Sequence, residues 1–272
     1  FALRQLLRNE ERIQELPRPL RIADDWEERH IIQEDLKERL QKDRISEIQD
    51  LFSQLSADWE TLERDNPEWE DLFPDPAFIG AWREHRRMFG YTLRSELVYQ
   101  LKRALNQYPD LELEDEFRHV LVDEYQDLNA CDLAVVRELS RHGCEVYAVG
   151  DDDQSIYGFR YAAPQGIRRF TDEYQPCEDL RLETCYRCDR SILRNAEFVA
   201  SLDPDRLDKG TTARYGAAEG EVRLLRFINQ HQEADNIARL CQHLIRVDDV
   251  DPDEILILLR SDRHHALSSL LC

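Results

Sequence analysis

Two short apolar runs in the middle of the chain each end abruptly in acids and amides. Val120-Leu121-Val122 and the run at 146–149 are typical of strands that are buried on both faces of a parallel sheet. Ligands of open α/β sheets bind at the carboxyl ends of such strands. We therefore expect the polar residues that follow the two runs to converge on one edge, namely Asp123, Glu124, Gln126, Asp151, Asp152 and Gln154.

The first hundred residues show helical spacing instead. Residues 1–15 predict a helix, the highly charged stretch 24–89 predicts several, and residues 91–106 predict another. The clearest pattern is amphipathic, with apolar residues at i, i+3, i+4, i+7 and i+11. Its members are Ile48, Leu51, Phe52, Leu55 and Trp59.

The pattern changes to alternating strands and helices after Pro109. Strands are predicted near 119–123, 145–149 and 179–183, and helices near 129–141 and 164–174. A second such unit follows a Gly- and Ala-rich segment, with strands at 221–228 and 254–260 and helices at 233–245 and 263–272. We therefore predict an α/β fold with a helical insertion.

Composition narrows the class of protein. The 272 residues are 42% hydrophobic, which is enough for folded cores. No apolar run approaches the ~20 residues needed to span a membrane, and the early charges do not fit a signal peptide. Because Phe1 is not an initiator Met, we expect a piece of a longer protein. The net charge of −21 argues against a general nucleic-acid binder but leaves a locally basic groove open.

Seven cysteines are too few for a disulfide scaffold and favour a reducing cytoplasm. Cys185 and Cys188 form one C-x-x-C, a spacing seen in zinc and redox sites. Because neither a second pair nor histidines at zinc spacing accompany them, we favour small packing residues.

Three strings resemble motifs of one enzyme family, in the family's order. HVLVDEYQDLN at 119–129, VYAVGDDDQSIYGFR at 146–160 and LRLETCYRCDRSIL at 180–193 resemble motifs II, III and IV of the UvrD/Rep/PcrA helicases of superfamily 1. The resemblance covers essentially the whole chain. It implies an ATP-dependent DNA helicase that moves 3′ to 5′ on single-stranded DNA and unwinds duplex at junctions, in repair or recombination.

The resemblance also implies a division into domains. Residues 1–24 and 90–190 would be part of a first RecA-like motor domain, and residues 25–89 its inserted helical subdomain. Residues 195–272 would begin a second RecA-like domain.

Hydrolysis of a nucleoside triphosphate needs a Mg²⁺ held by carboxylates and a group that orients water. Asp123 is the expected magnesium ligand and Glu124 the expected water-positioning group, and the resemblance implies the same roles. An isolated Asp-Glu pair after a strand also fits the charged N-terminus of a helix. Gln126 and the acidic run at 150–154 favour the catalytic interpretation.

Motif III adds a candidate coupling residue and a candidate DNA contact. The resemblance implies that Gln154 links the γ-phosphate to the bound strand. Three adjacent carboxylates repel one another, so the aspartates at 151–153 are expected to accept backbone N–H groups of a tight turn. Tyr157, Phe159 and Arg160 combine aromatic and cationic groups suited to single-stranded DNA, although the two rings could instead be core residues.

Motif IV supplies Tyr186 and Arg187. The resemblance implies that Tyr186 stacks on the base of ATP and that Arg187 reaches the γ-phosphate, whereas the plain alternative is a core Tyr beside a solvated Arg. The sequence departs from the family's motifs at two places. Cys185 stands where the family usually has Asn, and Tyr161-Ala162 stands where it usually has Gly-Ala.

The phosphate-binding sequence G-x-x-x-x-G-K-[ST] does not occur, and residues 209–212 hold its letters in the wrong order. We therefore expect this chain alone to bind ATP weakly and to hydrolyse none. The alternative function is a naturally shortened, non-catalytic module that binds DNA or docks a partner. The sequence leaves repair or nuclease partners open.

Overall fold

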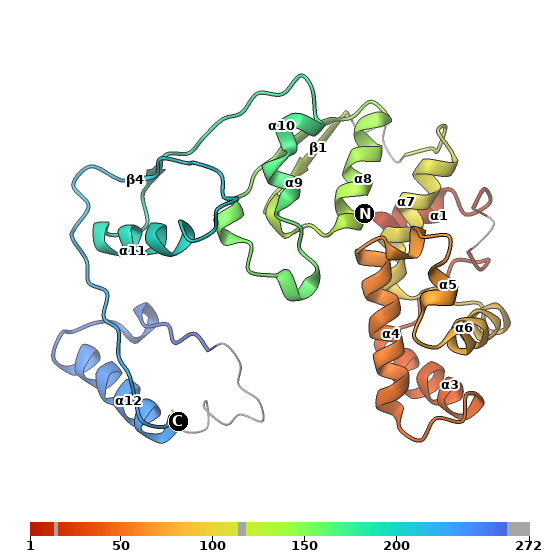
Figure 1. Ribbon diagram of the computed structural model, residues 1–272, viewed down its shortest axis with the longest axis horizontal. Coiled ribbons are helices and arrows are strands. Elements are labelled where there is room, and N and C mark those ends of the chain that lie inside the picture. Colours follow the sequence, from red (N-terminus) through yellow and green to blue (C-terminus); the bar gives the residue numbers. More distant parts are fainter. Residues whose placement is uncertain (14–15, 114–117, 260–272) are drawn as a thin grey trace. The chain divides into compact units, whose positions relative to one another are not determined.

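The computed structural model describes residues 1–13, 16–113 and 118–259. The chain, coloured by residue number in Figure 1, divides into two compact units. The first unit comprises Phe1–Glu183 and Ala200–Gly210, and the second comprises Thr184–Val199 and Thr211–Cys272. The segment Ala200–Gly210 therefore belongs to the first unit, although it follows the first part of the second unit in the sequence.

The first half of the first unit is helical, as its spacing predicts. Its helices are α1 (Ala2–Arg8), α2 (Asp25–Glu27), α3 (Gln33–Arg39), α4 (Ile45–Glu60), α5 (Trp69–Leu72), α6 (Pro76–Phe89) and α7 (Leu97–Gln107). α1 is shorter than the predicted helix over 1–15, of which residues 14–15 lie outside the described part. α7 begins six residues later than predicted, after a 3₁₀ turn over Arg94–Glu96.

The longest of these helices, α4, carries the predicted amphipathic stripe into an aromatic core. All five predicted positions are buried, and Ile48 and Leu55 are fully inaccessible. α4 packs on α3, and α6 packs on α3 and α5, an arrangement visible in Figure 1. Phe52 of α4 meets Phe78 of α6 edge to face, with ring centroids 5.1 Å apart. Helical spacing thus predicted both the element and its buried side.

The second half of this unit contains the parallel sheet. β1 (His119–Val122) pairs in parallel with β2 (Glu145–Ala148), and α8 (Ala130–Arg141) connects them. This is the strand–helix–strand unit that the apolar runs predict. Burial alternates along both strands, however, because α8 residues cover only one face. Leu121 and Tyr147, which lie opposite each other in the register, are 74% and 59% exposed. The prediction of burial on both faces is therefore wrong for this structure.

Two further predictions differ from the structure. The helix predicted over 164–174 is two short helices, α9 (Gln165–Arg168) and α10 (Phe170–Glu173). The strand predicted at 179–183 is absent, because the chain there has no regular secondary structure, and Leu182 is 91% exposed. A strand exists only where a neighbouring strand pairs with it, and among the described residues the sheets do not include 179–183.

The second unit holds a short parallel pair and two helices. β3 (Thr184–Cys185) pairs with β4 (Thr212–Ala213), α11 covers Arg190–Ala200, and α12 covers Gln230–Arg246. α12 confirms the helix predicted over 233–245. The strand predicted at 221–228 and the described part of the one at 254–260 form no ladder. Leu224 is 99% exposed, so apolar composition alone did not produce a strand. The helix predicted over 263–272 lies outside the described residues.

Across the described ranges, none of the helices combines the length and apolar character that crossing a lipid bilayer requires.

Candidate functional site

The carboxyl ends of β1 and β2 are joined by backbone hydrogen bonds beyond the two strands. The Val149 amide donates to the Val122 carbonyl at 2.9 Å, and the Tyr125 amide donates to the Val149 carbonyl at 2.9 Å. The residues that follow β1 and those that follow β2 therefore share one edge of the sheet, as the two apolar runs predict.

Asp123 and Glu124 form a strained, exposed turn at this edge. Glu124 has a φ of 50°, in the left-handed region that costs a residue with a side chain roughly 1–2 kcal/mol. The Glu124 amide donates to Asp123 Oδ1 at 3.0 Å, and both side chains are exposed. Strain of this kind persists only where neighbouring contacts hold it, and it concentrates at functional sites.

The helix-capping alternative for this acidic pair does not fit the geometry. α8 is capped by Asn129, whose side chain accepts from the Asp132 amide at 2.9 Å. A 3₁₀ turn over Tyr125–Asp127 separates the acidic pair from that helix. The pair therefore lies outside the first turn of α8, where carboxylates would stabilise the helix dipole.

Gln126 connects the two predicted motifs directly. Its side chain is buried, with Nε2 donating to Glu124 Oε2 at 2.9 Å and Oε1 accepting from the Asp151 amide at 3.0 Å. The Gln126 carbonyl also accepts from Ser155 Oγ at 3.3 Å. A buried amide with both ends engaged fixes the position of what it touches, so Gln126 holds the turn after β1 against the turn after β2.

Gly150 is required by the close approach of these two turns. A Cβ at this position would lie 2.5 Å from Gln126 Oε1, 2.7 Å from Ile167 Cδ1 and 3.1 Å from the Tyr125 amide nitrogen. Any side chain would therefore push apart the residues that join the two motifs.

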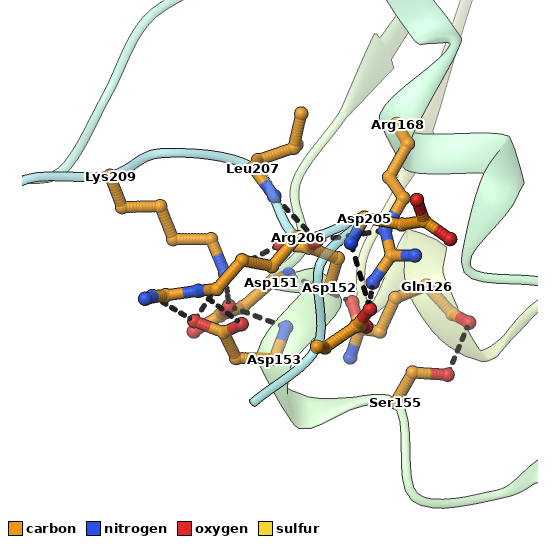
Figure 2. A network of polar contacts seen from close by, with 11 residues as sticks. Gln126, Asp151, Asp152, Asp153, Ser155, Arg168, Asp205, Arg206, Leu207 and Lys209 are labelled. Atoms are coloured by element: carbon orange, nitrogen blue, oxygen red, sulfur yellow. Dashed lines mark hydrogen bonds and ion pairs between the residues drawn. The ribbon is translucent and has the colours of Figure 1, made fainter. Parts of the chain in front are cut away.

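The three aspartates of motif III form ion pairs with lysine and arginine side chains of this chain, which the sequence analysis did not predict. Figure 2 shows Lys209 and Arg206 reaching the acidic turn from the returning segment Ala200–Gly210. The Lys209 ammonium lies 2.5 Å from Asp152 Oδ1 and 2.8 Å from Asp153 Oδ2, and it also pairs with Asp151. Arg206 donates to both oxygens of Asp153, at 3.1 and 2.7 Å. Such bidentate pairs are among the stronger charge-assisted contacts.

Asp152 is the buried centre of this network. Its Oδ2 accepts from Arg168 Nε at 2.9 Å and from the Leu207 amide at 2.9 Å, and its side chain is inaccessible to solvent. The predicted backbone role of the aspartates holds for Asp151, whose Oδ1 accepts from the Asp153 amide at 3.1 Å. The sequence signal that could have predicted these ion pairs is the presence of two basic residues, Arg206 and Lys209, in a chain with an excess of acidic residues.

The network keeps its members charged. Burial alone raises the pKa of Asp151 and of Asp152, but hydrogen bonds from Lys209 and other donors outweigh it, and both pKa values fall below the ordinary range. Burial likewise lowers the pKa of Lys209, and its hydrogen bonds to the three aspartates more than reverse this, so its net shift is upward.

The oxygens of these aspartates come within 4.8 Å of one another, as ligands of a metal ion would. The Lys209 ammonium lies among them, however, so the place of a cation is taken by the protein's own charge. Asp123, exposed at the end of β1 with hard oxygen donors, fits the chemistry of a magnesium ligand better than the aspartate cluster does.

Gln154 is held by the same cluster. Its Nε2 donates to Asp151 Oδ2 at 2.8 Å, while Asp151 pairs with Lys209. The side chain of Gln154 is exposed. Lys209 and Gln154 therefore share the carboxylate of Asp151.

The predicted DNA-contact residues follow on an exposed turn. Tyr157 is 38% and Phe159 74% exposed, and their rings meet edge to face with centroids 5.8 Å apart. Arg160 ends the 3₁₀ turn over Gly158–Arg160, and Tyr161 follows with a φ of 58°. The exposure of both rings contradicts the alternative that they are core residues.

Tyr186 and Arg187 belong to the second unit, directly after β3. Tyr186 is 76% exposed and Arg187 is exposed, so the alternative of a core Tyr is wrong. That these two residues face the site of Asp123 stays a prediction.

Comparisons with known proteins agree with the motifs. A family model described as the UvrD/REP helicase N-terminal domain matches residues 1–175. The match implies a RecA-like α/β fold, to which the parallel β1–β2 pair and its connecting helix conform.

Individual relatives carry helicase names. The chain is similar to ATP-dependent DNA helicase UvrD1 of Mycobacterium leprae, with 29% identity over 81% of this chain. This chain is also 35% identical to DNA helicase II of Haemophilus influenzae over 47% of this chain's length. It is 32% identical to ATP-dependent DNA helicase srs2 of Schizosaccharomyces pombe over 56% of this chain's length. The aligned region spans 29%, 18% and 18% of these relatives. Since the family model covers more than half of the 272 residues, the chain belongs to the UvrD/REP helicase family.

Proposed function

We propose that this chain is the central part of an ATP-dependent DNA helicase that couples ATP hydrolysis to 3′-to-5′ movement on single-stranded DNA, in DNA repair or recombination. The family match and the helicase names of the relatives support this proposal. The small share of each relative that is covered supports the view that the phosphate-binding loop and the last motifs lie on other parts of the protein.

The observation that carries the proposal is the bridge made by Gln126. It ties Glu124 of motif II to the Asp151 amide of motif III. In a motor, a residue that senses the γ-phosphate must be coupled mechanically to a residue that senses the DNA strand. A buried amide between the two turns supplies such a coupling.

The two exposed carboxylates receive distinct roles. Asp123 would hold the magnesium ion of Mg²⁺-ATP, since Mg²⁺ takes one or two protein carboxylates alongside substrate phosphates. Glu124 would position the attacking water and accept its proton, because its carboxylate is exposed and oriented by Gln126. The bound metal would polarise the phosphate oxygens and neutralise their charge.

The remaining roles follow the motifs. Gln154 would sense the nucleotide and pass its state to Tyr157, Phe159 and Arg160, the residues proposed to grip single-stranded DNA at the junction with duplex. Tyr186 would stack on the base of ATP, and Arg187 would supply positive charge to the γ-phosphate. The exposure of Tyr157, Phe159, Tyr186 and Arg187 supports these roles.

The test is a Glu124→Gln variant of the full-length protein that contains this chain. Turnover of ATP is expected to fall by about 10²–10⁴-fold, the range of general-base contributions, while ATP binding is retained. Glutamine keeps the shape and one oxygen for Gln126, so the turn survives. Glu178→Gln, at another exposed glutamate, is the matched control and should leave turnover unchanged. Wild-type turnover in Glu124→Gln would remove the assigned role.

One observation favours the alternative of a non-catalytic module, namely that G-x-x-x-x-G-K-[ST] does not occur in the 272 residues. The two proposals differ in what precedes Phe1 in the gene. A helicase requires a Gly-Lys-Thr or Gly-Lys-Ser loop upstream, and its absence there would reject the enzyme.

A further inference from the structure

Cys185 and Cys188 come together in a tight turn between β3 and α11. The Cys188 amide donates to Cys185 Sγ at 3.4 Å. Both side chains are partly exposed, so small reagents can reach them, and their role as packing residues stays a prediction. The two residues between them are Tyr186 and Arg187, which are both exposed.

The surroundings make the two thiols unlike each other. Backbone N–H groups of Cys188 and Arg187 lower the pKa of Cys185, and the Cys188 thiol adds a further hydrogen bond. Burial raises the pKa of Cys188, and the neighbouring Cys185 raises it further. The turn lies just before α11, whose N-terminal dipole favours negative charge on a nearby sulfur. One thiol is thus suited to attack and the other to resolve.

A zinc site explains the pair less well. Zinc takes four ligands in structural sites and three in catalytic sites. Among the described residues, His, Cys, Asp and Glu ligand atoms gather in a set of three or more only at Asp151–Asp153. Cys185 and Cys188 therefore have no third ligand in the part of the chain that the structure describes.

We propose that Cys185 and Cys188 form a thiol–disulfide exchange site that reacts with small disulfides of the glutathione class. The Cys185 thiolate attacks one sulfur of the small disulfide, whose S–S bond breaks and releases one thiolate, which takes up a proton. Cys188 then loses its proton and attacks the Cys185 sulfur of the mixed disulfide, releasing the second small thiol. The two cysteines are oxidised by two electrons, and the small disulfide is reduced to two thiols.

The product would close a ring around Tyr186 and Arg187. These two residues are the proposed contacts to ATP, so a disulfide that fixes the backbone on either side of them would alter nucleotide binding. This consequence rests on the proposed function. The exchange reaction itself does not, because it needs only the turn in this chain.

The test uses the full 272-residue chain and oxidised glutathione. After the reaction, free thiols are blocked with N-ethylmaleimide and the unfolded protein is digested with trypsin. Cleavage after Arg181, Arg187 and Arg190 places Cys185 and Cys188 on different peptides, 182–187 and 188–190. A disulfide between the cysteines therefore appears in the mass spectrum as a linked pair of peptides, without any measurement of ATP.

Single variants separate the two steps. Cys188→Ser should accumulate the mixed disulfide at Cys185, because the resolving thiol is gone. In Cys185→Ser, the remaining thiol is Cys188, which should take up glutathione slowly. Its incorporation should be several-fold lower than the incorporation at Cys185 in the Cys188→Ser variant. Cys177 and Cys241, which are also partly exposed, are the internal controls and should react several-fold more slowly than Cys185.

The pH dependence of alkylation provides a second readout. The rate at Cys185 should reach half its maximum below pH 8.5, the approximate pKa of an ordinary cysteine. The proposal is overturned if no linked peptides form in excess oxidised glutathione, or if Cys177 or Cys241 reacts as fast as Cys185. If the linked pair forms but nucleotide binding to the full-length protein is unchanged, the exchange site stands and the assignment of Tyr186 and Arg187 fails.

Discussion

Lys209 and Asp152 form a contact that joins the returning segment of the first unit to motif III. The Lys209 ammonium lies 2.5 Å from Asp152 Oδ1, and the Asp152 side chain is inaccessible to solvent. Lys209 follows Asp151, another of its three carboxylate partners, by 58 residues. The chain thus leaves the sheet, forms β3 and α11, and returns to neutralise the turn that carries Gln154.

Lys209→Met should destabilise the protein and loosen this turn. The substitution removes the cation shared by three carboxylates, and a hydrogen bond to a charged group contributes about 1.5–3 kcal/mol. Urea unfolding should show a loss in that range. Lys37→Met is the matched control, because Lys37 makes one surface pair with Glu34 at 3.6 Å, worth at most about 1 kcal/mol. Equal losses in both variants would mean that the network is not structural.

The difference in stability between wild type and Lys209→Met should depend on pH. Asp151 and Asp152 have lowered pKa values in the folded chain, so their stabilisation is complete above the unfolded value of about 3.9 and is lost as pH falls further. Lys209 has a raised pKa, so its contribution is complete below about 10.4 and is lost above its folded value. Unfolding free energies measured from pH 3 to 11 should therefore differ most between about 4 and 10. A difference that is constant over the whole range would contradict an ionic origin.

Gly150→Ala should disturb the junction of motifs II and III. The added Cβ would lie 2.5 Å from Gln126 Oε1, and overpacking of this kind costs about 1–3 kcal/mol. Gly158→Ala is the control, since a Cβ there meets nothing within 4 Å. Thermal unfolding of the two variants checks the prediction. If Gly158→Ala proves as destabilising as Gly150→Ala, the close approach at Gly150 is not what requires a glycine.

Arg86 and Glu96 form a buried ion pair in the helical part of the first unit. Arg86 Nη1 lies 3.0 Å from Glu96 Oε2, and the Glu96 side chain is fully inaccessible. Burial raises the pKa of Glu96, while Arg86 opposes that shift. Arg86→Met leaves the carboxylate uncompensated and should cost about 3–5 kcal/mol.

The double variant Arg86→Met, Glu96→Leu tests the reason for that cost. Because it removes both charges, it should recover a large part of the lost stability in urea unfolding. If the double variant is less stable than Arg86→Met alone, the carboxylate is held by the Leu93 amide and Gln100 and does not depend on Arg86.

The spacing of apolar residues along the sequence predicted the helices and strands that bury one face against neighbouring elements. The stripe from Ile48 to Trp59 predicted α4 and its buried face, and the two apolar runs predicted β1, β2 and their shared edge. Repeating apolar positions carry this information because burial of one face is what stabilises a helix or a strand. The same reasoning failed at 221–228, where the composition suits a strand but no strand of the described ranges pairs with it.

Some residues of the candidate site could likewise be predicted from the sequence, and others could not. Asp123, Glu124 and Gln154 could be found from the sequence, because they follow predicted strands within a few residues and match known motifs. Only the tertiary structure showed that Gln126 bridges the two turns and that Arg206 and Lys209 neutralise the three aspartates. Contacts between residues 25 to 58 positions apart leave no periodic trace in the sequence, because their geometry is decided by how the chain returns on itself.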